Sequence, residues 1–258
     1  MEPPAHLELC RGGPHRDVTA PPASPSRLRA FLRQRFSREG TVGLYLTIGF
    51  CVCALLIVLF GSLADEVFEV HGGSTLDRRV TEAVRALQTP SRDALALAVT
   101  QLGSWRFLMP ATLAVAGTLA WKKHPVSALL FAGCVVGGWL LEVLLKISYH
   151  RTRPDLWPSL VSEKSASFPS GHATMSTLFF GACVALVYHL SRSRRLRAAA
   201  TVAGVLVVLA VGFTRIYLGA HWLTDVIAGF LVGLFWVVVS ATGTEFFARR
   251  GRARRLNH

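Results

Sequence analysis

The sequence predicts an all-α integral membrane protein, built as a six-helix bundle with both termini in the cytoplasm. Three observations lead to this fold class. Apolar residues make up 52% of the 258 residues, and mean hydropathy is +0.42. Charged residues make up only 17%, whereas soluble domains have about 25%. The basic residues lie in short blocks between long apolar runs, as in the cytoplasmic flanks of membrane helices.

The formal net charge of +13 does not by itself indicate a nucleic-acid-binding protein. Such a protein carries its basic residues on one face of a soluble domain, whereas here they flank apolar segments. The expected partner is therefore the lipid bilayer, and no nucleic acid is expected. The five cysteines show no paired spacing of metal ligands, so we expect packing residues.

The chain divides into three regions. Residues 1–42 are rich in Pro, Ser and Arg and predict a disordered, basic cytoplasmic tail. Residues 43–248 hold six apolar segments, and a hydrocarbon core needs about 20 helical residues to be crossed. Residues 249–258 predict a second basic cytoplasmic tail. The six segments are Gly43–Ala64, Phe107–Trp121, Val126–Leu145, Ala173–Leu190, Ala198–Phe213 and Val226–Thr244.

Three features of the early chain qualify this plan. No small-residue cleavage site is evident after the first segment, so we expect an anchor and not a removed signal peptide. The second segment is short, although the stretch from Ser91 would lengthen it. Between these two segments, Leu76–Leu87 has the apolar spacing of a short amphipathic helix that lies on the bundle or at the interface.

The charges between the segments orient the bundle. With a cytoplasmic N-terminus, the inner tails and loops hold 18 of the 28 basic residues. Six spans with both ends inside then satisfy the positive-inside rule at every loop. Under this topology three polar stretches lie on the same outer face of the membrane. They are Lys146 through Arg153-Pro154, Pro169-Ser170-Gly171-His172, and Arg215 through His221 to Asp225.

The residue types in these stretches suit the binding and transfer of phosphate. Lys146, Arg153 and Arg215 supply cations, and guanidinium groups match phosphate oxygens in a bidentate way. Ser170 and Gly171 open a helix, where free N–H groups and the helix dipole favour an anion.

The histidines and the aspartate predict the chemistry of transfer. His221 and Asp225 stand four residues apart on one helix face, so the carboxylate would hold the imidazole tautomer and leave the other ring nitrogen free to attack phosphorus. His172 would protonate the leaving oxygen.

These three stretches resemble the motifs of the type 2 phosphatidic acid phosphatases, which are related in fold to bacterial acid phosphatases and vanadium haloperoxidases. The family pattern is Lys-x6-Arg-Pro, Pro-Ser-Gly-His and Ser-Arg-x5-His-x3-Asp. The chain departs from it only at Thr214, where the family usually has Ser, and a hydroxyl is kept. The resemblance covers residues from about Lys146 to Asp225.

The resemblance implies a role for each matched residue. It makes His221 the nucleophile that forms a phosphohistidine, Asp225 its orienting residue and His172 the general acid. It also implies hydrolysis without a metal or another cofactor. The residues that it implies for phosphate binding are Lys146, Arg153, Ser170, Gly171 and Arg215.

The expected function is a metal-independent phosphatase for a lipid phosphate or diphosphate on the outer membrane face. Candidate substrates are an isoprenyl diphosphate such as undecaprenyl diphosphate, phosphatidic acid or phosphatidylglycerol phosphate. The short, nearly insert-free chain favours a bacterial inner-membrane enzyme. A lipid phosphotransferase, a vanadium haloperoxidase-like oxidoreductase and a transporter with a vestigial site are the alternatives. The sequence leaves the oligomeric state open.

Two charged residues near the motifs allow two interpretations each. Glu142, inside a span, is either a functional acid or the structural partner of Lys146 one helical turn away. Arg151 is either a further phosphate ligand or a solvated loop residue.

Overall fold

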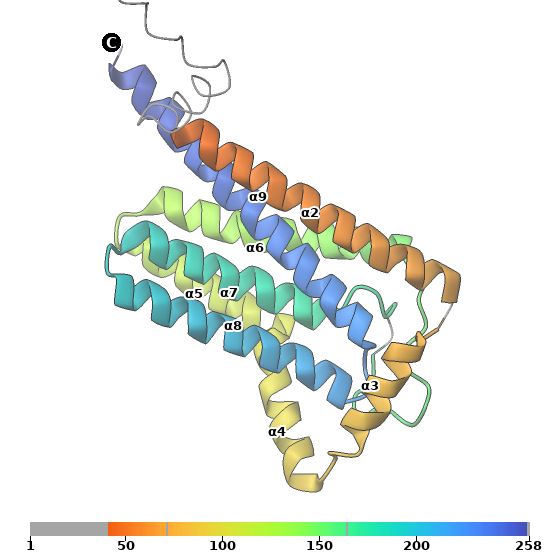
Figure 1. Ribbon diagram of the computed structural model, residues 1–258. Coiled ribbons are helices and arrows are strands. Elements are labelled where there is room, and N and C mark those ends of the chain that lie inside the picture. The colour runs from red at the N-terminus through yellow and green to blue at the C-terminus, as the bar shows by residue number, and fades with distance from the viewer. Residues whose placement is uncertain (1–40, 71, 164, 257–258) are drawn as a thin grey trace, which may run out of the picture. The chain divides into compact units, whose positions relative to one another are not determined.

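The computed structural model describes residues 41–70, 72–163 and 165–256. This part of the chain is all-helical, with eight α-helices, a short 3-10 helix and no strand (Figure 1). The helices are α2 (Thr41–Val70), α3 (Thr75–Arg85), α4 (Pro90–Thr100), η1 (Gln101–Gly103), α5 (Trp105–Trp121), α6 (Pro125–Ser148), α7 (Gly171–Leu190), α8 (Arg194–Tyr217) and α9 (Leu223–Leu256).

Five stretches within these helices are long and apolar enough to cross a membrane. They are Leu46–Val67, Pro125–Ser148, Gly171–Leu190, Arg194–Tyr217 and Leu223–Thr244. They correspond to the first and the last four of the six predicted spans. The integral membrane class is therefore confirmed, because helices of this length and hydropathy satisfy their backbone hydrogen bonds internally within lipid.

The remaining predicted span corresponds to α5, which has only 17 residues. At a rise of 1.5 Å per residue such a helix is about 25 Å long, somewhat short of a hydrocarbon core of about 30 Å. The predicted extension from Ser91 does not continue α5, because η1 and Ser104 separate it from α4. The Ser104 hydroxyl caps α5 by accepting a hydrogen bond from the Phe107 N–H at 3.4 Å.

Helix α7 packs against α5, α6, α8 and α9, and most of its first nine residues are buried. Figure 1 shows α5, α7 and α8 running side by side, while α2 and α9 cross over α6. Small residues let α7 and α9 approach closely, because a Cβ on Gly233 would lie 2.6 Å from the Thr177 Cβ. Close backbone approach of this kind is typical of helix pairs in membranes.

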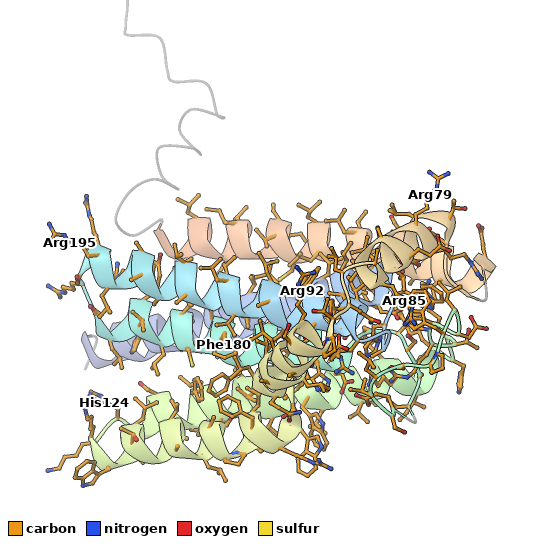
Figure 2. The ribbon with its side chains drawn as sticks, turned by 90° about the horizontal axis from the view of Figure 1, so that it is seen from below. Arg79, Arg85, Arg92, His124, Phe180 and Arg195 are labelled. Carbon is orange, nitrogen blue, oxygen red and sulfur yellow. The ribbon has the colours of Figure 1, made fainter. Side chains whose placement is uncertain are left out.

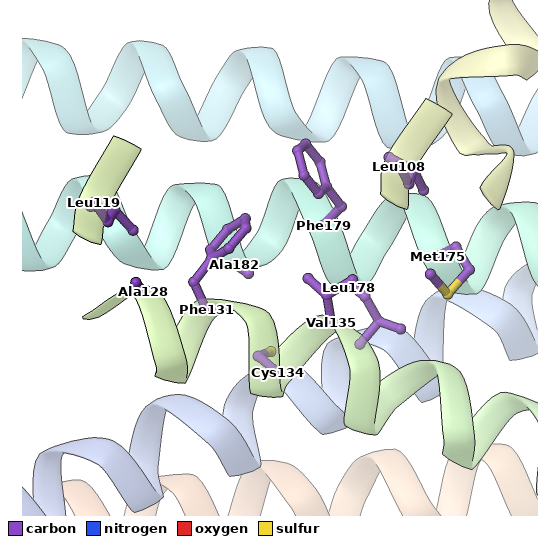
Figure 3. Close-up of a cluster of buried hydrophobic side chains, with 10 residues drawn as sticks. All are labelled: Leu108, Leu119, Ala128, Phe131, Cys134, Val135, Met175, Leu178, Phe179 and Ala182. Atoms are coloured by element: carbon purple, nitrogen blue, oxygen red, sulfur yellow. The ribbon is translucent and has the colours of Figure 1, made fainter. Parts of the chain in front are cut away.

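One buried apolar cluster joins α5, α6 and α7 (Figure 3). Phe131 of α6 meets Phe179 of α7 edge to face, with ring centroids 5.7 Å apart. Cys134 lies in this cluster as a packing residue, as predicted for the apolar-run cysteines. The cluster also includes Leu108, Leu119, Ala128, Val135, Met175, Leu178 and Ala182. It holds the short α5 against the bundle.

The predicted amphipathic helix is present as α3, and it packs on the bundle. Its N-terminus is closed by a capping box between Ser74 and Asp77. The face that packs consists of Asp77, Thr81 and Val84. Leu76, by contrast, is 58% exposed although its spacing suggested burial. Asp77, and not Leu76, occupies the buried face of α3, because the Asp77 carboxylate has buried partners that are described below.

Successive long helices run in opposite directions, so that the three motif-bearing segments gather at one end. Figure 2 shows Arg79 and Arg85 at this end, and His124 and Arg195 at the opposite end. The predicted N-terminal tail, residues 1–42, falls almost entirely outside the described residues. In the predicted C-terminal tail, residues 249–258, the backbone of α9 continues to Leu256.

Candidate active site

The turn between α8 and α9 places His221. Helix α8 ends at Tyr217, and Gly219 adopts a left-handed conformation with φ of +70°. The N–H groups of Ala220 and His221 then donate to the Arg215 carbonyl at 3.1 and 3.2 Å. This closure resembles a glycine C-cap, in which a residue without Cβ reverses the chain at low cost. This turn brings the His221 imidazole next to Ser167, in the loop that follows α6.

The His221 ring is 2% exposed, and its contacts assign the tautomer. Nδ1 lies 2.8 Å from the Ser167 carbonyl oxygen, to which it donates as N–H. Nε2 is therefore the unprotonated nitrogen, and it lies 3.2 Å from the Arg153 Nη1. Burial and, to a smaller extent, the charges of Arg215 and Arg153 lower the pKa of His221 to about 4, although Asp225 raises it. The ring is neutral at pH 7.

Asp225 stands on the Nδ1 side of this ring, farther away than the Ser167 carbonyl. Its Oδ2 lies 3.5 Å from Nδ1. The same oxygen accepts hydrogen bonds from the Ser167 hydroxyl and, at 2.9 Å, from the Trp222 N–H. The backbone carbonyl of Ser167 is thus closer to Nδ1 than Asp225, which was the one residue that the sequence analysis predicted to orient the ring.

Arg153 lies on the Nε2 side of His221. Its Nη1 donates to the Ala220 carbonyl at 2.7 Å and its Nε donates to the Ser165 carbonyl at 3.0 Å. Burial lowers the pKa of the Arg153 guanidinium, while Glu163 and Asp225 raise it. The group stays charged, because arginine loses its proton only far above neutral pH.

Arg215 is 1% exposed and is held from two sides. Its Nη1 donates to the Thr100 hydroxyl at 3.0 Å, and its Nη2 donates to Glu163 Oε1 at 2.7 Å. Among the residues that the structure describes, its buried Nε has no hydrogen-bond partner. Glu163 comes from the loop between α6 and α7, and it was not identified by the sequence analysis.

Lys146 and Gly171 meet at the start of α7. Lys146 Nζ pairs with Glu142 Oε1 at 3.0 Å, which confirms the structural interpretation of Glu142. A Cβ on Gly171 would lie 2.8 Å from that Oε1 and 3.2 Å from the Lys146 Nζ. Only glycine therefore allows this approach without displacing the ion pair.

Ser170 occupies the N-cap position of α7, yet its side chain caps nothing. Its hydroxyl is buried and has no hydrogen-bond partner within the described part of the chain. Its N–H donates to the Asp225 carbonyl at 3.0 Å, which fixes the start of α7 against α9. Buried polar groups are rarely left unpaired without a reason. The first-turn N–H groups of α7 and this hydroxyl are donors available to an anion.

His172, at the second position of α7, completes the set of predicted residues. It lies within the electrostatic influence of Lys146, Arg153, Arg215 and His221. Its backbone carbonyl would lie 2.9 Å from a Cβ on Gly103, so η1 packs closely against it. The structure thus brings all eight predicted site residues to one end of the bundle.

Arg151 differs from both sequence interpretations, because only 6% of the residue is exposed and its guanidinium pairs with two buried carboxylates. Its Nη1 lies 2.5 Å from Asp225 Oδ1 and its Nη2 lies 2.7 Å from Asp77 Oδ2. Its Nη2 also donates to the Gly72 carbonyl at 2.9 Å. The partners could not be read from sequence, because both carboxylates lie 74 residues away along the chain.

A cavity of about 560 Å³ opens beside Arg153 and Glu163. Pro154, Gly219, Ala220 and the loop residues 159–162 complete its lining. Its volume lies within the range of small-ligand sites. Among the described residues, no group of three or more His, Cys, Asp and Glu side chains is placed to hold a metal ion.

Several known proteins with related sequences are phosphatases. A family model described as the PAP2 superfamily matches residues 121–248. Phosphatidylglycerophosphatase B of Bacillus subtilis (strain 168) is 31% identical over 180 residues, covering 69% of this chain and 88% of that protein. A lipid A 1-phosphatase of Rhizobium johnstonii is 35% identical over 135 residues, covering 49% of this chain and 50% of that protein.

Solved structures show the same fold. The first transmembrane PAP2 type phosphatidylglycerolphosphate phosphatase from Bacillus subtilis matches with a TM-score of 0.67 and 28% identity, covering 75% of this chain and 96% of that one. Aquifex aeolicus LpxE matches with a TM-score of 0.51 and 22% identity over 65% and 95% of the two chains, which shows a shared fold alone.

The relatives and the helical architecture together define a membrane-bound lipid phosphate phosphatase. The chain belongs to the PAP2 superfamily, which confirms the resemblance seen in its three motifs.

Proposed function

We propose that this phosphatase hydrolyses its lipid phosphate through a phosphohistidine on His221, without a metal ion. The observation that carries the proposal is the state of the His221 ring. Its Nδ1 is 2.8 Å from the Ser167 carbonyl, so the lone pair lies on Nε2, on the Arg153 side. Burial lowers the pKa of this ring to about 4, so the nucleophilic neutral form predominates at neutral pH.

The cations and free donors around this nitrogen suit a tetrahedral anion. Arg153, Arg215 and Lys146 neutralise its charge, and guanidinium groups bind phosphate oxygens strongly. Arg215 Nε and the Ser170 hydroxyl, which have no hydrogen-bond partner among the described residues, gain partners when a phosphate oxygen binds. Donors fixed before the reaction stabilise developing negative charge without reorganisation.

The reaction then takes place in two steps. Nε2 of His221 attacks phosphorus and the bond to the leaving oxygen breaks. His172, which becomes protonated when the anionic phosphate binds among the surrounding cations, gives its proton to the leaving oxygen. The phosphorylated ring now holds a proton on Nδ1 and carries positive charge, which Asp225 and the Ser167 carbonyl stabilise. A water molecule gives a proton to neutral His172 and attacks phosphorus, which releases phosphate and restores both histidines.

The substrate we propose is a lipid that presents a terminal phosphate at the extracytoplasmic face of a bacterial inner membrane. Phosphatidylglycerol phosphate is favoured, because the relative with 31% identity is named a phosphatidylglycerophosphatase. Phosphatidic acid and an isoprenyl diphosphate are the other candidates. The cationic site suits the terminal phosphate that all three share.

The topology we propose has six spans, with α5 as the short second span and both termini in the cytoplasm. Support comes from the end of the bundle opposite the site, where Figure 2 places His124 and Arg195. In the sequence, His124 directly follows Lys122–Lys123, and Arg195 belongs to the basic block Arg192–Arg197. Such blocks are typical of the cytoplasmic side.

The proposal is tested by phosphate release from the three lipids in detergent, with EDTA present, and by trapping the intermediate with radiolabelled lipid. We expect a phosphoryl group on His221 that is stable to alkali and labile to acid. His221→Ala should lose at least about a thousandfold in kcat while the protein stays membrane-inserted. Wild-type turnover by this variant would refute the nucleophile, and loss of activity with EDTA would refute the metal-free reaction.

A phosphotransferase would give a different product. Label that moves from the donor lipid to another lipid, with little free phosphate formed, would replace the hydrolase proposal. The acid lability of the enzyme-bound label would be the same in both cases.

A further inference from the structure

Three buried charges from three parts of the chain form a cluster next to the proposed nucleophile. Asp77 lies on α3, Arg151 in the loop after α6, and Asp225 in the first turn of α9. The Arg151 side chain is 2% exposed and both carboxylates are 0% exposed. Each Nη atom of Arg151 pairs with one carboxylate, Nη2 with Asp77 at 2.7 Å and Nη1 with Asp225 at 2.5 Å.

The cluster is not electrically balanced. Two carboxylates share one guanidinium, so one negative charge is in excess. This excess lies on the Nδ1 side of His221, since Asp225 Oδ2 is 3.5 Å from that nitrogen. The cations Arg153 and Arg215 act on the same ring and favour its neutral form. Buried charges interact strongly because water does not screen them.

Asp77 also satisfies backbone and side-chain groups of another helix. Its Oδ1 accepts from the Thr224 N–H at 2.9 Å, and its Oδ2 accepts from the Thr224 hydroxyl at 2.8 Å. It thereby caps an orphan donor in the first turn of α9 from outside that helix. The same carboxylate closes the capping box of α3 with Ser74. One residue thus connects α3 to the segment that carries Asp225.

We infer that Arg151 and Asp77 are positioning residues that set the charge felt by His221. The inference rests on the proposed function, because it concerns the stability of a phosphorylated imidazole. Arg151 holds Asp225 in place and neutralises part of its charge. Because the Arg151 guanidinium also pairs with Asp77, it neutralises the charge of Asp225 only in part. Asp225 therefore retains enough negative charge to stabilise the cationic ring that forms when phosphorus binds Nε2.

Charge changes in the cluster should shift the titration of His221 in opposite directions. Arg151→Gln leaves two negative charges in excess and should raise the pH at which His221 protonates by about one unit. Asp77→Asn leaves none in excess and should lower it by a similar amount. The double variant keeps the original excess and should return near the wild type.

The titration is measured by two readouts on each full-length variant in detergent. The first is the acid limb of the kcat/KM profile for phosphate release. The second is the rate at which diethyl pyrocarbonate acylates His221, located by mass spectrometry, because this reagent attacks neutral imidazole and does not share the ionisation of the substrate phosphate. Both should fall in the wild type as pH drops through about 4. The other charged and titratable groups that face the ring are the same in every variant, and they are Asp225, Arg153, Arg215 and His172.

Two controls separate charge from folding. Glu82→Gln removes an exposed carboxylate from the same helix as Asp77 and should shift neither readout. Arg151→Lys keeps the positive charge and should hold the titration near the wild type even if thermal stability falls. Thermal unfolding of every variant reports the structural role separately.

Opposite shifts with recovery in the double variant support the inference. Unchanged titration in the folded single variants would overturn it and leave Asp77 and Arg151 as anchors of α3 alone. Failure of the proposed function looks different, because His221→Ala would then keep its phosphate release while the acylation rates still report the charge of the cluster.

Discussion

Single side chains decide how His221 and the proposed phosphate site behave. His221 is neutral because it is buried beside arginines, and a carbonyl at 2.8 Å selects Nε2 as the nitrogen proposed to attack phosphorus. Glu163 acts on the same site from the loop after α6. Its carboxylate accepts from Arg215 Nη2 at 2.7 Å and lines the cavity beside Arg153. A phosphate oxygen would compete with Glu163 for this donor.

Glu163→Gln should therefore tighten the binding of oxyanions. Removing the competing charge should lower the inhibition constant of vanadate about fivefold, because a larger fraction of the enzyme has Arg215 free for the ligand. Inhibition of phosphate release by vanadate measures this constant. Asp155→Asn, which neutralises an exposed carboxylate of the same loop, should leave it unchanged. Weaker inhibition in Glu163→Gln would show that Glu163 holds Arg215 in a binding position.

Helix termini are the elements that build the site. The start of α7 supplies Ser170, Gly171 and His172, and the free N–H groups of a helix N-terminus favour an anion. The end of α6 supplies Lys146, and the end of α8 supplies Arg215. The end of α6 meets the start of α7 closely only because position 171 lacks a side chain.

Gly171→Ala should reduce activity without unfolding the protein. The added methyl group would displace the Lys146–Glu142 pair by a few tenths of an ångström, and we expect kcat/KM to fall about tenfold, since small misplacements of binding groups are costly in rate. Gly133→Ala on α6 is the matched control, because a Cβ there meets nothing within 4 Å. Equal activities of the two variants would show that the close contact at Gly171 does not matter for catalysis.

Alternation of helix direction places the loops of the bundle at two ends. The motif-bearing segments lie at one end, while His124 and Arg195 lie at the other (Figure 2). The five long apolar stretches are long enough to cross a membrane. The proposed topology therefore puts the site at one surface of the membrane, where a lipid headgroup is presented while its chains remain in the bilayer.

The proposed sidedness can be measured with single cysteines and a membrane-impermeant thiol reagent. In intact bacteria, Asp155→Cys near the site should be labelled, and His124→Cys should be labelled only after permeabilisation. The parent protein, which has five cysteines, supplies the background. The reverse pattern would place the site in the cytoplasm, and labelling of both positions in intact cells would contradict a bundle that spans the membrane.

Many residues of the candidate site could be predicted from the sequence, because they lie close together in the chain at spacings that helix geometry makes informative. His221 and Asp225, or Ser170 through His172, lie within one or two turns of chain, where helix geometry determines which side chains meet. The three motifs also predicted the family that the comparisons show. The Lys146–Glu142 pair was one of the two interpretations of Glu142 for the same local reason.

The remaining contacts required the folded chain, since they join segments far apart in sequence. The Ser167 carbonyl near His221 is a backbone group 54 residues from the ring, and no residue type encodes it. Arg151 could have been solvated, and only its burial between Asp77 and Asp225 reveals a charge cluster. Glu163 lies between two motifs without a spacing that marks it.

Hydropathy, the blocks of basic residues and the three motifs were enough to predict a helical membrane phosphatase, because transfer of side chains to lipid and i to i+4 geometry are local properties. Packing alone decided where α4 and α5 separate, which group fixes the His221 tautomer and how one guanidinium is divided between two carboxylates. Those outcomes depend on the burial of groups brought together by loops, and burial is a property of the whole fold.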